Sequence, residues 1–208
     1  DEVYSIPGYR RFIYFTRPSG TFDQFDRQEY LMPEDKVGKI IWALQQTPDE
    51  VSNYDSYKVD SVRIRDILVC THGSVDAACA RFGYPLYRYL RDEAAREDVR
   101  VWRVNHFGGH VFAPTLMDMP RGDYWAFVDR ADGKQIVERA GDIAQLHKRF
   151  RGNAALSGSF AQVLEREILM REGWKWLSYQ RRSVEVAEVA NEDDERLSSA
   201  TIRIEHQS

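Results

Sequence analysis

The chain has 208 residues, 43% of them hydrophobic, which is enough for one large or two small domains with an ordinary apolar core. A formal net charge of -4 disfavours a nucleic-acid-binding protein, whose surface usually carries a basic patch, and no apolar run approaches the roughly 20 residues that span a bilayer. Because the first residues lack a signal-peptide pattern and two cysteines cannot form a disulfide framework, we expect a cytoplasmic protein with reduced thiols.

The first 60 residues carry one strand pattern and one helix pattern. Residues 10–18 (RRFIYFTRP) are rich in β-branched and aromatic side chains and end at a proline, which predicts a strand. Residues 33–48 begin with Pro33 and two acidic residues, and their apolar side chains recur at helical spacing, which predicts a helix with proline in its first turn. We therefore expect residues 1–60 to form a strand–helix segment that packs on the core.

The strongest strand pattern of the chain lies in residues 61–73, where the sequence DILVC is a continuous apolar run of the kind found in buried central strands. Ser74 and Asp76 then open a helix, in which Gly83 and Pro85 predict a break or kink. The spacing of apolar residues predicts the inner face of this helix: Ala77, Ala78, Phe82, Leu86 and Leu90.

The remaining core elements follow in order. Residues 98–107 predict a second strand, and residues 113–129 predict a hairpin whose turn is the sequence PRGD. Residues 158–174 predict a long helix with an apolar inner face: Phe160, Val163, Leu164, Ile168 and Leu169. A strand, helix and strand followed by a hairpin and a packing helix make up a thioredoxin-like plan. We therefore expect an α/β (α+β) fold in residues 61–180, with a central mixed sheet flanked by helices.

Two weaker patterns complete the chain. Short helical patterns lie near residues 135–140 and 143–150. The tail alternates with period two on both sides of the sequence NEDDER, so residues 181–208 are expected to form a C-terminal β extension, either a hairpin or a solvated segment.

Both cysteines and two of the five histidines fall into two tight groups, each just past a predicted strand end, where function usually collects in open α/β sheets. Cys79 follows Cys70 after eight intervening residues, and His110 follows His106 after three. Two of those three residues are glycines, which let the backbone fold tightly: Phe107, Gly108 and Gly109. The position of Cys79 near a helix N-terminus favours its thiolate form.

Two thiols and two imidazoles form a ligand set that suits either of two metal centres. They fit a mononuclear zinc ion, and they fit a [2Fe-2S] cluster in which two thiolates hold one iron and two imidazoles hold the other. An ordinary zinc finger places its cysteines about two to four residues apart, whereas eight residues intervene here. The wide first loop favours the larger two-iron centre, and a zinc site remains the alternative.

Three stretches of the chain resemble a known family: CTHGSVDAACARFGYPLYR, HFGGHVFAPTL and EREILMREGW. They look like the sucrase/ferredoxin-like family, which belongs to the thioredoxin-like [2Fe-2S] ferredoxins, and the resemblance covers roughly residues 9–179. Related thioredoxin-like ferredoxins carry two cysteines with the same spacing where this family carries the histidine pair. The resemblance implies that four residues bind a [2Fe-2S] cluster as metal ligands: Cys70, Cys79, His106 and His110.

The resemblance also implies electron transfer rather than sucrose hydrolysis. We expect a one-electron redox carrier rather than a self-sufficient enzyme. Its electron transfer is expected to be coupled to proton transfer at the imidazoles. Because no Rossmann glycine fingerprint or flavin motif is present, it would need an external donor reductase and an acceptor protein. Two other functions stay open: a thiol–disulfide oxidoreductase that uses Cys70 and Cys79, although a C-x-x-C motif is missing, and a structural Cys2His2 zinc module.

Residues around the four ligands are candidates for supporting contacts: Thr71, His72, Gly73, Ser74, Phe107, Gly108 and Gly109. We expect backbone N–H groups of residues 71–78 to donate to cluster sulfurs, and His72 to lie beside the ligands or face solvent. Arg81, Arg88 and Arg91 recur at near-helical spacing, and for them a solvated face is favoured over a docking patch for an acidic partner.

Overall fold

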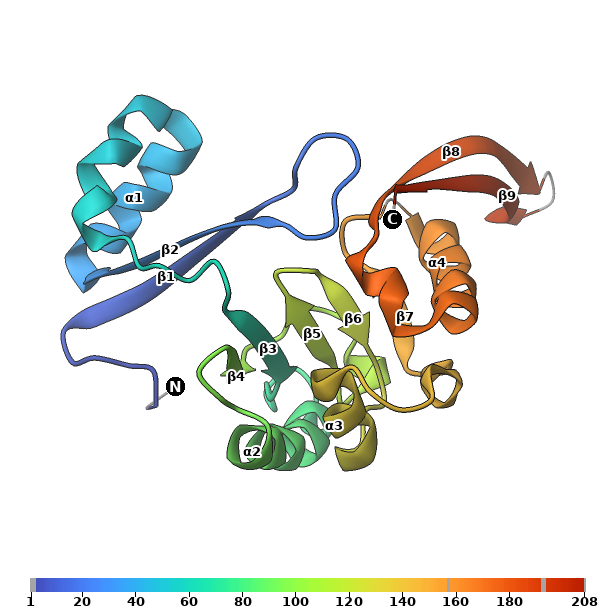
Figure 1. The fold of residues 1–208 in the computed structure, drawn as a ribbon, viewed down its shortest axis with the longest axis horizontal. Coiled ribbons are helices and arrows are strands. Elements are labelled where there is room, and N and C mark those ends of the chain that lie inside the picture. The colour runs from blue at the N-terminus through green and yellow to red at the C-terminus, as the bar shows by residue number, and fades with distance from the viewer. Residues whose placement is uncertain (1–2, 157, 192–193, 208) are drawn as a thin grey trace. The chain divides into compact units, whose positions relative to one another are not determined.

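The computed structural model describes residues 3–156, 158–191 and 194–207. The chain folds into two compact units, one comprising Asp1–Thr16 and Asp26–Ile64 and the other Arg17–Phe25 and Arg65–Ser208 (Figure 1). The expected packing of residues 1–60 on the core stays a prediction.

The first unit is a two-stranded antiparallel sheet with one α-helix packed on it. Its elements are β1 (Tyr9–Thr16), β2 (Asp26–Pro33) and α1 (Glu34–Gln46), followed by a 3₁₀ helix over Pro48–Tyr57. Tyr30 and Met32 of β2 and Ile40 of α1 are fully buried and form its core. The predicted strand and helix are confirmed, whereas the sequence pattern does not predict β2.

The second unit is built on a five-stranded mixed sheet in the order β4-β3-β5-β6-β7. The strands are β3 (Arg65–Cys70), β4 (Val99–Val104), β5 (Leu116–Met119), β6 (Asp123–Trp125) and β7 (Phe150–Asn153). β3 and β4 run parallel, while β5, β6 and β7 pair antiparallel. The predicted hairpin, the central mixed sheet and the thioredoxin-like order of elements are confirmed.

Helices flank this sheet. They are α2 (Tyr84–Glu93), preceded by a π-helical turn at Cys79–Gly83, α3 (Arg130–Glu138) and α4 (Gly158–Glu172). α2 and α3 lie side by side, and α4 packs along β7 (Figure 1). Short 3₁₀ helices span His110–Phe112, Ile143–Leu146 and Gly173–Ser178. No helix in the described part of the chain is both long enough and apolar enough to span a membrane.

The inner face of the helix that follows Cys70 differs from the prediction. Leu86 and Leu90 are buried, as expected, but Ala77 and Phe82 are exposed. The π-helical turn adds a residue to the helical repeat, so side chains before it are rotated away from the face that the apolar spacing predicts. The kink expected in the middle of this helix takes the form of that wider turn rather than an interruption.

The C-terminal tail forms an antiparallel hairpin of β8 (Gln180–Asn191) and β9 (Asp194–Gln207), which confirms the first of the two expected forms of this extension. Its start is tied to the rest of the unit through backbone hydrogen bonds between Arg181 and Phe22, of 3.0 and 3.3 Å. Glu192 and Asp193 lie outside the described residues.

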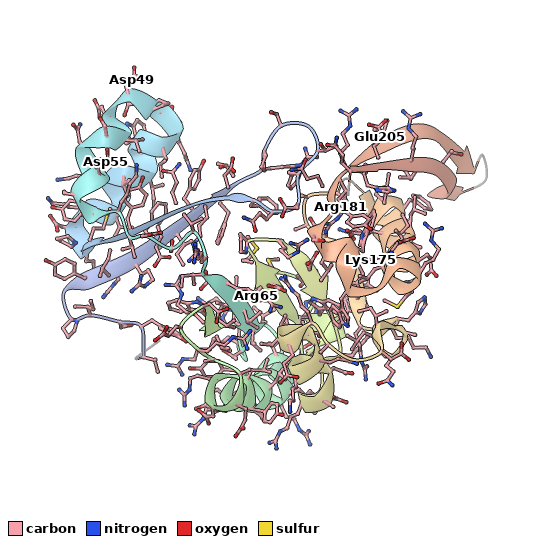
Figure 2. The ribbon with its side chains drawn as sticks, in the orientation of Figure 1. Asp49, Asp55, Arg65, Lys175, Arg181 and Glu205 are labelled. Carbon is pink, nitrogen blue, oxygen red and sulfur yellow. The ribbon has the colours of Figure 1, made fainter. Side chains whose placement is uncertain are left out.

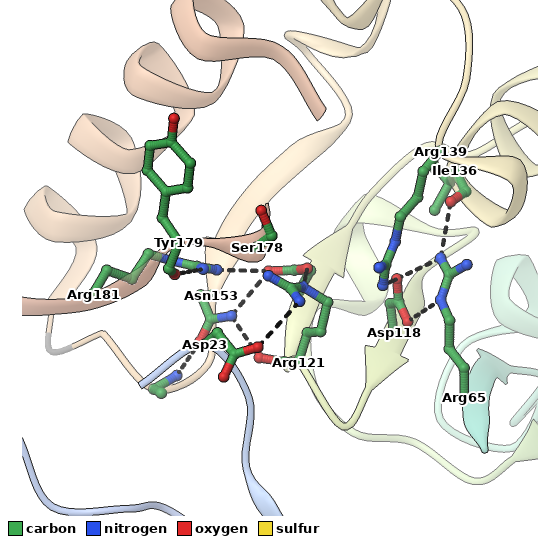
Figure 3. A network of polar contacts seen from close by, with 12 residues as sticks. Asp23, Arg65, Asp118, Arg121, Ile136, Arg139, Asn153, Ser178, Tyr179 and Arg181 are labelled. Carbon is green, nitrogen blue, oxygen red and sulfur yellow. Dashed lines mark hydrogen bonds and ion pairs between the residues drawn. The ribbon is translucent and has the colours of Figure 1, made fainter. Parts of the chain in front are cut away.

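Two groups of buried ion pairs hold the second unit together, and Figure 2 labels an arginine from each, Arg65 and Arg181. In the first group, Arg65 of β3 donates two hydrogen bonds of 2.7 and 2.6 Å to Asp118 of β5. Arg139, at the end of α3, contacts the same carboxylate at 3.3 Å (Figure 3). Burial alone would raise the pKa of Asp118, but these two guanidinium groups hold it below its usual value. The pairs therefore tie β3 and β5 to α3.

The second group joins α4 to the C-terminal segment. Arg181 pairs with Glu165 of α4 at 2.7 Å and with Asp123 of β6 at 3.3 Å, and all three side chains are buried. Asn153 of β7, which lies next to Arg181 in Figure 3, donates its backbone N–H to Glu165 at 2.7 Å. Val163, predicted to face inward, is exposed, and Glu165 is buried instead because these donors satisfy its carboxylate.

We expect Glu165 to make the protein less stable as the pH rises. Burial raises the pKa of Glu165 to about 7, above its ordinary value of 4.5. Between these values the folded state holds more protons than the unfolded state, so stability present at low pH is lost as the pH rises through the folded pKa, by at most about 3 kcal/mol. Urea unfolding of Glu165→Gln should show a flatter pH profile; an equally steep profile would contradict the assignment.

Candidate metal centre

The first half of the site is fixed by the sheet. Cys70 is the last residue of β3, and its N–H donates to the Thr115 carbonyl at 3.2 Å, while the next N–H, from Thr71, donates to the Val104 carbonyl at 3.1 Å. These bonds hold the strand end between its two neighbours, so the Cys70 side chain has a defined position. It is 1% exposed.

The second cysteine lies in the π-helical turn, and a glycine brings that turn against the strand end. A Cβ on Gly83 would stand 2.0 Å from the carbonyl oxygen of Cys70, a distance that no real side chain occupies. The helix can therefore approach Cys70 this closely only because residue 83 is glycine. As a result Cys79, fully buried, lies beside Cys70 although eight residues separate them in the chain.

Some of the backbone donors that were expected to serve cluster sulfurs are used within the loop itself. The N–H groups of Gly73 and Val75 donate to the carbonyls of Thr71 and His72, and the N–H of Ala78 donates to the Asp76 side chain at 2.8 Å. These donors stabilise a compact turn into the helix and are not free to serve a ligand. Among the candidate supporting residues here, Gly73 and Ser74 are exposed, while Thr71 and His72 are half-buried.

The histidine loop depends on its two glycines. Gly108 and Gly109 have φ values of 102° and 71°, a region that residues with side chains disfavour. A 3₁₀ turn starts at the next residue, His110. The Tyr124 hydroxyl donates to the Gly108 carbonyl at 2.6 Å, and burial raises the pKa of Tyr124 to about 12, so it stays a donor. The ring of Phe107 meets Tyr124 edge-on at 5.4 Å.

A side chain of the cysteine loop contacts the histidine loop. The Nδ1 atom of His72 accepts a hydrogen bond of 3.3 Å from the backbone N–H of His106. This contact places His72 beside the candidate ligands as a positioning residue, consistent with one of the two placements expected for it.

Three of the four expected ligands meet at one point. The ligand atoms of Cys70, Cys79 and His106 all lie within 4.8 Å of one another. His110 is not a member of this set; its ring centroid is 5.6 Å from that of His106, and its side chain is exposed. The site therefore runs from two buried thiols, through a half-buried imidazole, to an exposed one.

The protonation of Cys79 differs from the expectation that a helix N-terminus would favour its thiolate. Burial, followed by the neighbouring Cys70, raises the pKa of the Cys79 thiol to about 11. Burial of this thiol therefore opposes its thiolate form. Both thiols are free, and a pair of buried thiols gains its charge-stabilising partner only when a cation binds.

These residues fit a metal centre on their own chemistry. The Nδ1 atom of His106 is buried and has no hydrogen-bond partner among the described residues, which is costly for a neutral imidazole. Two soft sulfur atoms lie within reach of the same ring. Thiolate and imidazole are the ligands of zinc and of iron–sulfur centres. A metal-bound group at this point would satisfy all three side chains at once.

A thioredoxin-like sheet with two thiols and an imidazole gathered at its strand ends defines a candidate metal-binding protein of the α/β class. A sequence profile of the sucrase/ferredoxin-like family matches residues 3–152. The chain belongs to that family.

Among curated proteins, the chain is 27% identical over 127 residues to altered inheritance of mitochondria protein 32 of Meyerozyma guilliermondii, which covers 57% of this chain. The matched region makes up 43% of that relative, so the chain spans less than half of its length. Among solved structures, a thioredoxin-like [2Fe-2S] ferredoxin from Aquifex aeolicus matches 45% of this chain and 94% of its own length, with 10% identity and a TM-score of 0.38. A cysteine-to-serine variant of the Aquifex aeolicus ferredoxin matches with a TM-score of 0.32 and 13% identity, over 36% of this chain and 85% of its own.

Sequence reasoning missed two residues that shape the site. The helical pattern predicts only a break at Gly83, although a glycine inside such a pattern is also a signal of close backbone approach. The sequence places Tyr124 only in the predicted hairpin, and no local pattern shows that its hydroxyl reaches the histidine loop.

Proposed function

We propose that this protein is a one-electron carrier whose [2Fe-2S] cluster is held by Cys70, Cys79, His106 and His110. The observation that supports it is the meeting of two buried free thiols with the half-buried imidazole of His106, whose ligand atoms lie within 4.8 Å, at the end of β3. Membership of the sucrase/ferredoxin-like family agrees with this ligand set. A cytoplasmic location stays a prediction.

When bound, the cluster supplies a centre that accepts and releases one electron. Cys70 and Cys79 would be its two buried ligands, and their burial would exclude water from the sulfur atoms. His106 and His110 would supply the other two ligands, of which His110 is exposed at the protein surface. His72 positions His106 through its backbone, and Tyr124 positions the loop between the histidines. The donor reductase and the acceptor protein are separate molecules.

Neutral imidazoles give this ligand set a dependence on pH that thiolates lack. The ring nitrogen that does not bind metal can hold a proton, which reduction favours, so the reduction potential should fall as the pH rises, by up to about 59 mV per unit. His106→Cys and His110→Cys should keep a centre but lower its potential and reduce this slope. Potentiometry over roughly pH 6 to 10 measures both, with His147→Cys, a partly exposed histidine elsewhere, as the control. A flat native profile would contradict imidazole ligation.

A structural zinc module is the second candidate, because three ligand atoms within 4.8 Å of one another also suit a single ion. The thiol–disulfide alternative is disfavoured by the structure. Both sulfurs are buried and the pKa of Cys79 is raised, whereas a catalytic thiol needs access and a stabilised thiolate.

Purification without oxygen, followed by visible spectroscopy and analysis of iron, sulfide and zinc, separates these functions. The proposal predicts a brown protein with iron and inorganic sulfide in equal amounts. A colourless protein that contains zinc would support the structural module instead. A protein with no metal and a reversible Cys70–Cys79 disulfide would support the oxidoreductase.

A further inference from the structure

Large apolar side chains are exposed around the outer end of the site. Val111, next to His110, is 65% exposed, and Phe127, which follows β6, is 43% exposed. Phe127 contacts the turn that starts at His110. Its ring meets that of Phe112 edge-on at 5.7 Å, and its N–H donates to the Phe112 carbonyl at 2.8 Å. These side chains therefore form one apolar area with the 3₁₀ turn that carries His110.

The same area extends to the helix that carries Cys79. Phe82, in the π-helical turn, is 48% exposed and faces Phe127 across a hollow of about 270 Å³. Arg81 and Arg130 line the same hollow. A second hollow of about 310 Å³ lies against the histidine loop, and Arg151 lines it. Each of the two hollows is thus lined by at least one arginine.

These three arginines have no carboxylate partner among the described side chains. Each instead lies over an aromatic ring, at 5.5 Å for Arg81, 5.6 Å for Arg130 and 4.0 Å for Arg151. The arginines predicted on the same helix behave differently, since Arg88 and Arg91 both pair with Asp92. Arg88 and Arg91 are thus neutralised locally, whereas Arg81 is not. The choice between a solvated face and a docking patch stays a prediction for all three.

Among the residues that line the two hollows, Asp129 is the one carboxylate. Asp129 lines the first hollow, but its side chain accepts the N–H of Asp132 at 2.9 Å and caps α3. Asp132 in turn pairs with Arg149 at 2.8 Å. The lining of the two hollows therefore carries three arginines and one aspartate, an excess of positive charge, although the whole chain has a net charge of -4.

We propose that this apolar surface with its arginines, defined by Arg81, Arg130, Arg151, Phe82 and Phe127, docks the acidic face of an electron-transfer partner. The inference rests on the proposed function, because electron tunnelling weakens steeply with distance and a partner must approach the exposed His110. Opposite charges steer such encounters, and exposed aromatics with arginines are the side chains that carry binding energy in interfaces.

The test measures binding, so it can be read whether or not iron is bound. The probes are cytochrome b5, which docks through an acidic face, and cytochrome c, which docks through a basic one. We expect calorimetry at low ionic strength to show that the native chain binds cytochrome b5 and that added salt weakens this binding. The charge reversal Arg81→Glu/Arg130→Glu/Arg151→Glu should weaken it at least about tenfold.

A matched control changes the net charge equally at another place. Arg171→Glu/Lys175→Glu/Arg203→Glu alters three exposed groups that line neither hollow, and its affinity should stay within about twofold of the native value. Circular dichroism checks that each variant is folded, and Arg81→Gln/Arg130→Gln/Arg151→Gln replaces the reversal variant if it is not.

Equal weakening by both triple variants, or preferred binding of cytochrome c, would overturn the docking surface. A brown protein that fails to bind cytochrome b5 would overturn it while leaving the proposed function in place. A colourless protein that binds cytochrome b5 through these arginines would instead contradict the proposed function and support the docking surface for an acidic partner.

Discussion

Replacing Gly83 by alanine should destroy the metal site and destabilise the second unit by about 3 kcal/mol or more, since such a clash exceeds ordinary overpacking. The added methyl group would stand 2.0 Å from the carbonyl oxygen of Cys70, and that oxygen belongs to the backbone of a central strand. Strand β3 is held by hydrogen bonds to a neighbouring strand on each side. We therefore expect the helix, rather than the strand, to shift away. Cys79, which lies four residues earlier in the same turn, would move with it.

The measurement is iron content per chain together with urea unfolding. Gly38→Ala is the matched control, because Gly38 is also helical but a Cβ there would meet nothing within 4 Å. This control should keep its iron and gain up to about 1 kcal/mol from the better helix propensity of alanine. A Gly83→Ala protein with native iron content and stability would show that the close approach of helix and strand is not needed.

Removing either thiol should abolish metal binding while leaving the fold in place. Serine nearly matches cysteine in shape, so Cys70→Ser and Cys79→Ser preserve the packing of two fully buried positions. A hydroxyl is a poor ligand for iron, and the loss of one ligand should lower iron content by more than about tenfold. We expect both variants to be colourless and to show native far-ultraviolet circular dichroism.

The same pair of variants separates the three functions. A zinc module would also lose its metal, but the native chain would then be colourless from the start. A thiol–disulfide enzyme would lose activity without any change in iron. Native chain and variants with equal iron content would contradict ligation by these cysteines.

Much of the second unit is readable from the sequence because its signals are local. The apolar run that ends at Cys70 and the PRGD turn between β5 and β6 depend on strand period and turn chemistry. β7 is missed because it has only four residues, one of them Gly152, and exists through its pairing with β6. β2 is missed because its sequence begins with four polar residues and its burial depends on α1.

The candidate site also has features that the sequence predicts and features that it does not. Ligand types and spacings are sequence properties, and so is the need for glycine between the histidines. The short distances between the ligand atoms of Cys70, Cys79 and His106 cannot be predicted from the sequence. They depend on the approach of a helix to a strand across Gly83. The exposure of Phe82 was missed for a related reason: a π-helical turn breaks the periodicity from which an inner face is predicted.

The central claim is that two sulfur atoms and two imidazole nitrogens hold a pair of irons. Pulsed EPR of the reduced protein, prepared with isotope-labelled histidine, observes those nitrogens directly. We predict magnetic couplings from two histidine nitrogens, one lost in His106→Cys and the other in His110→Cys. A reduced protein with an iron–sulfur signal but no histidine coupling, or with couplings that both variants retain, would contradict the account.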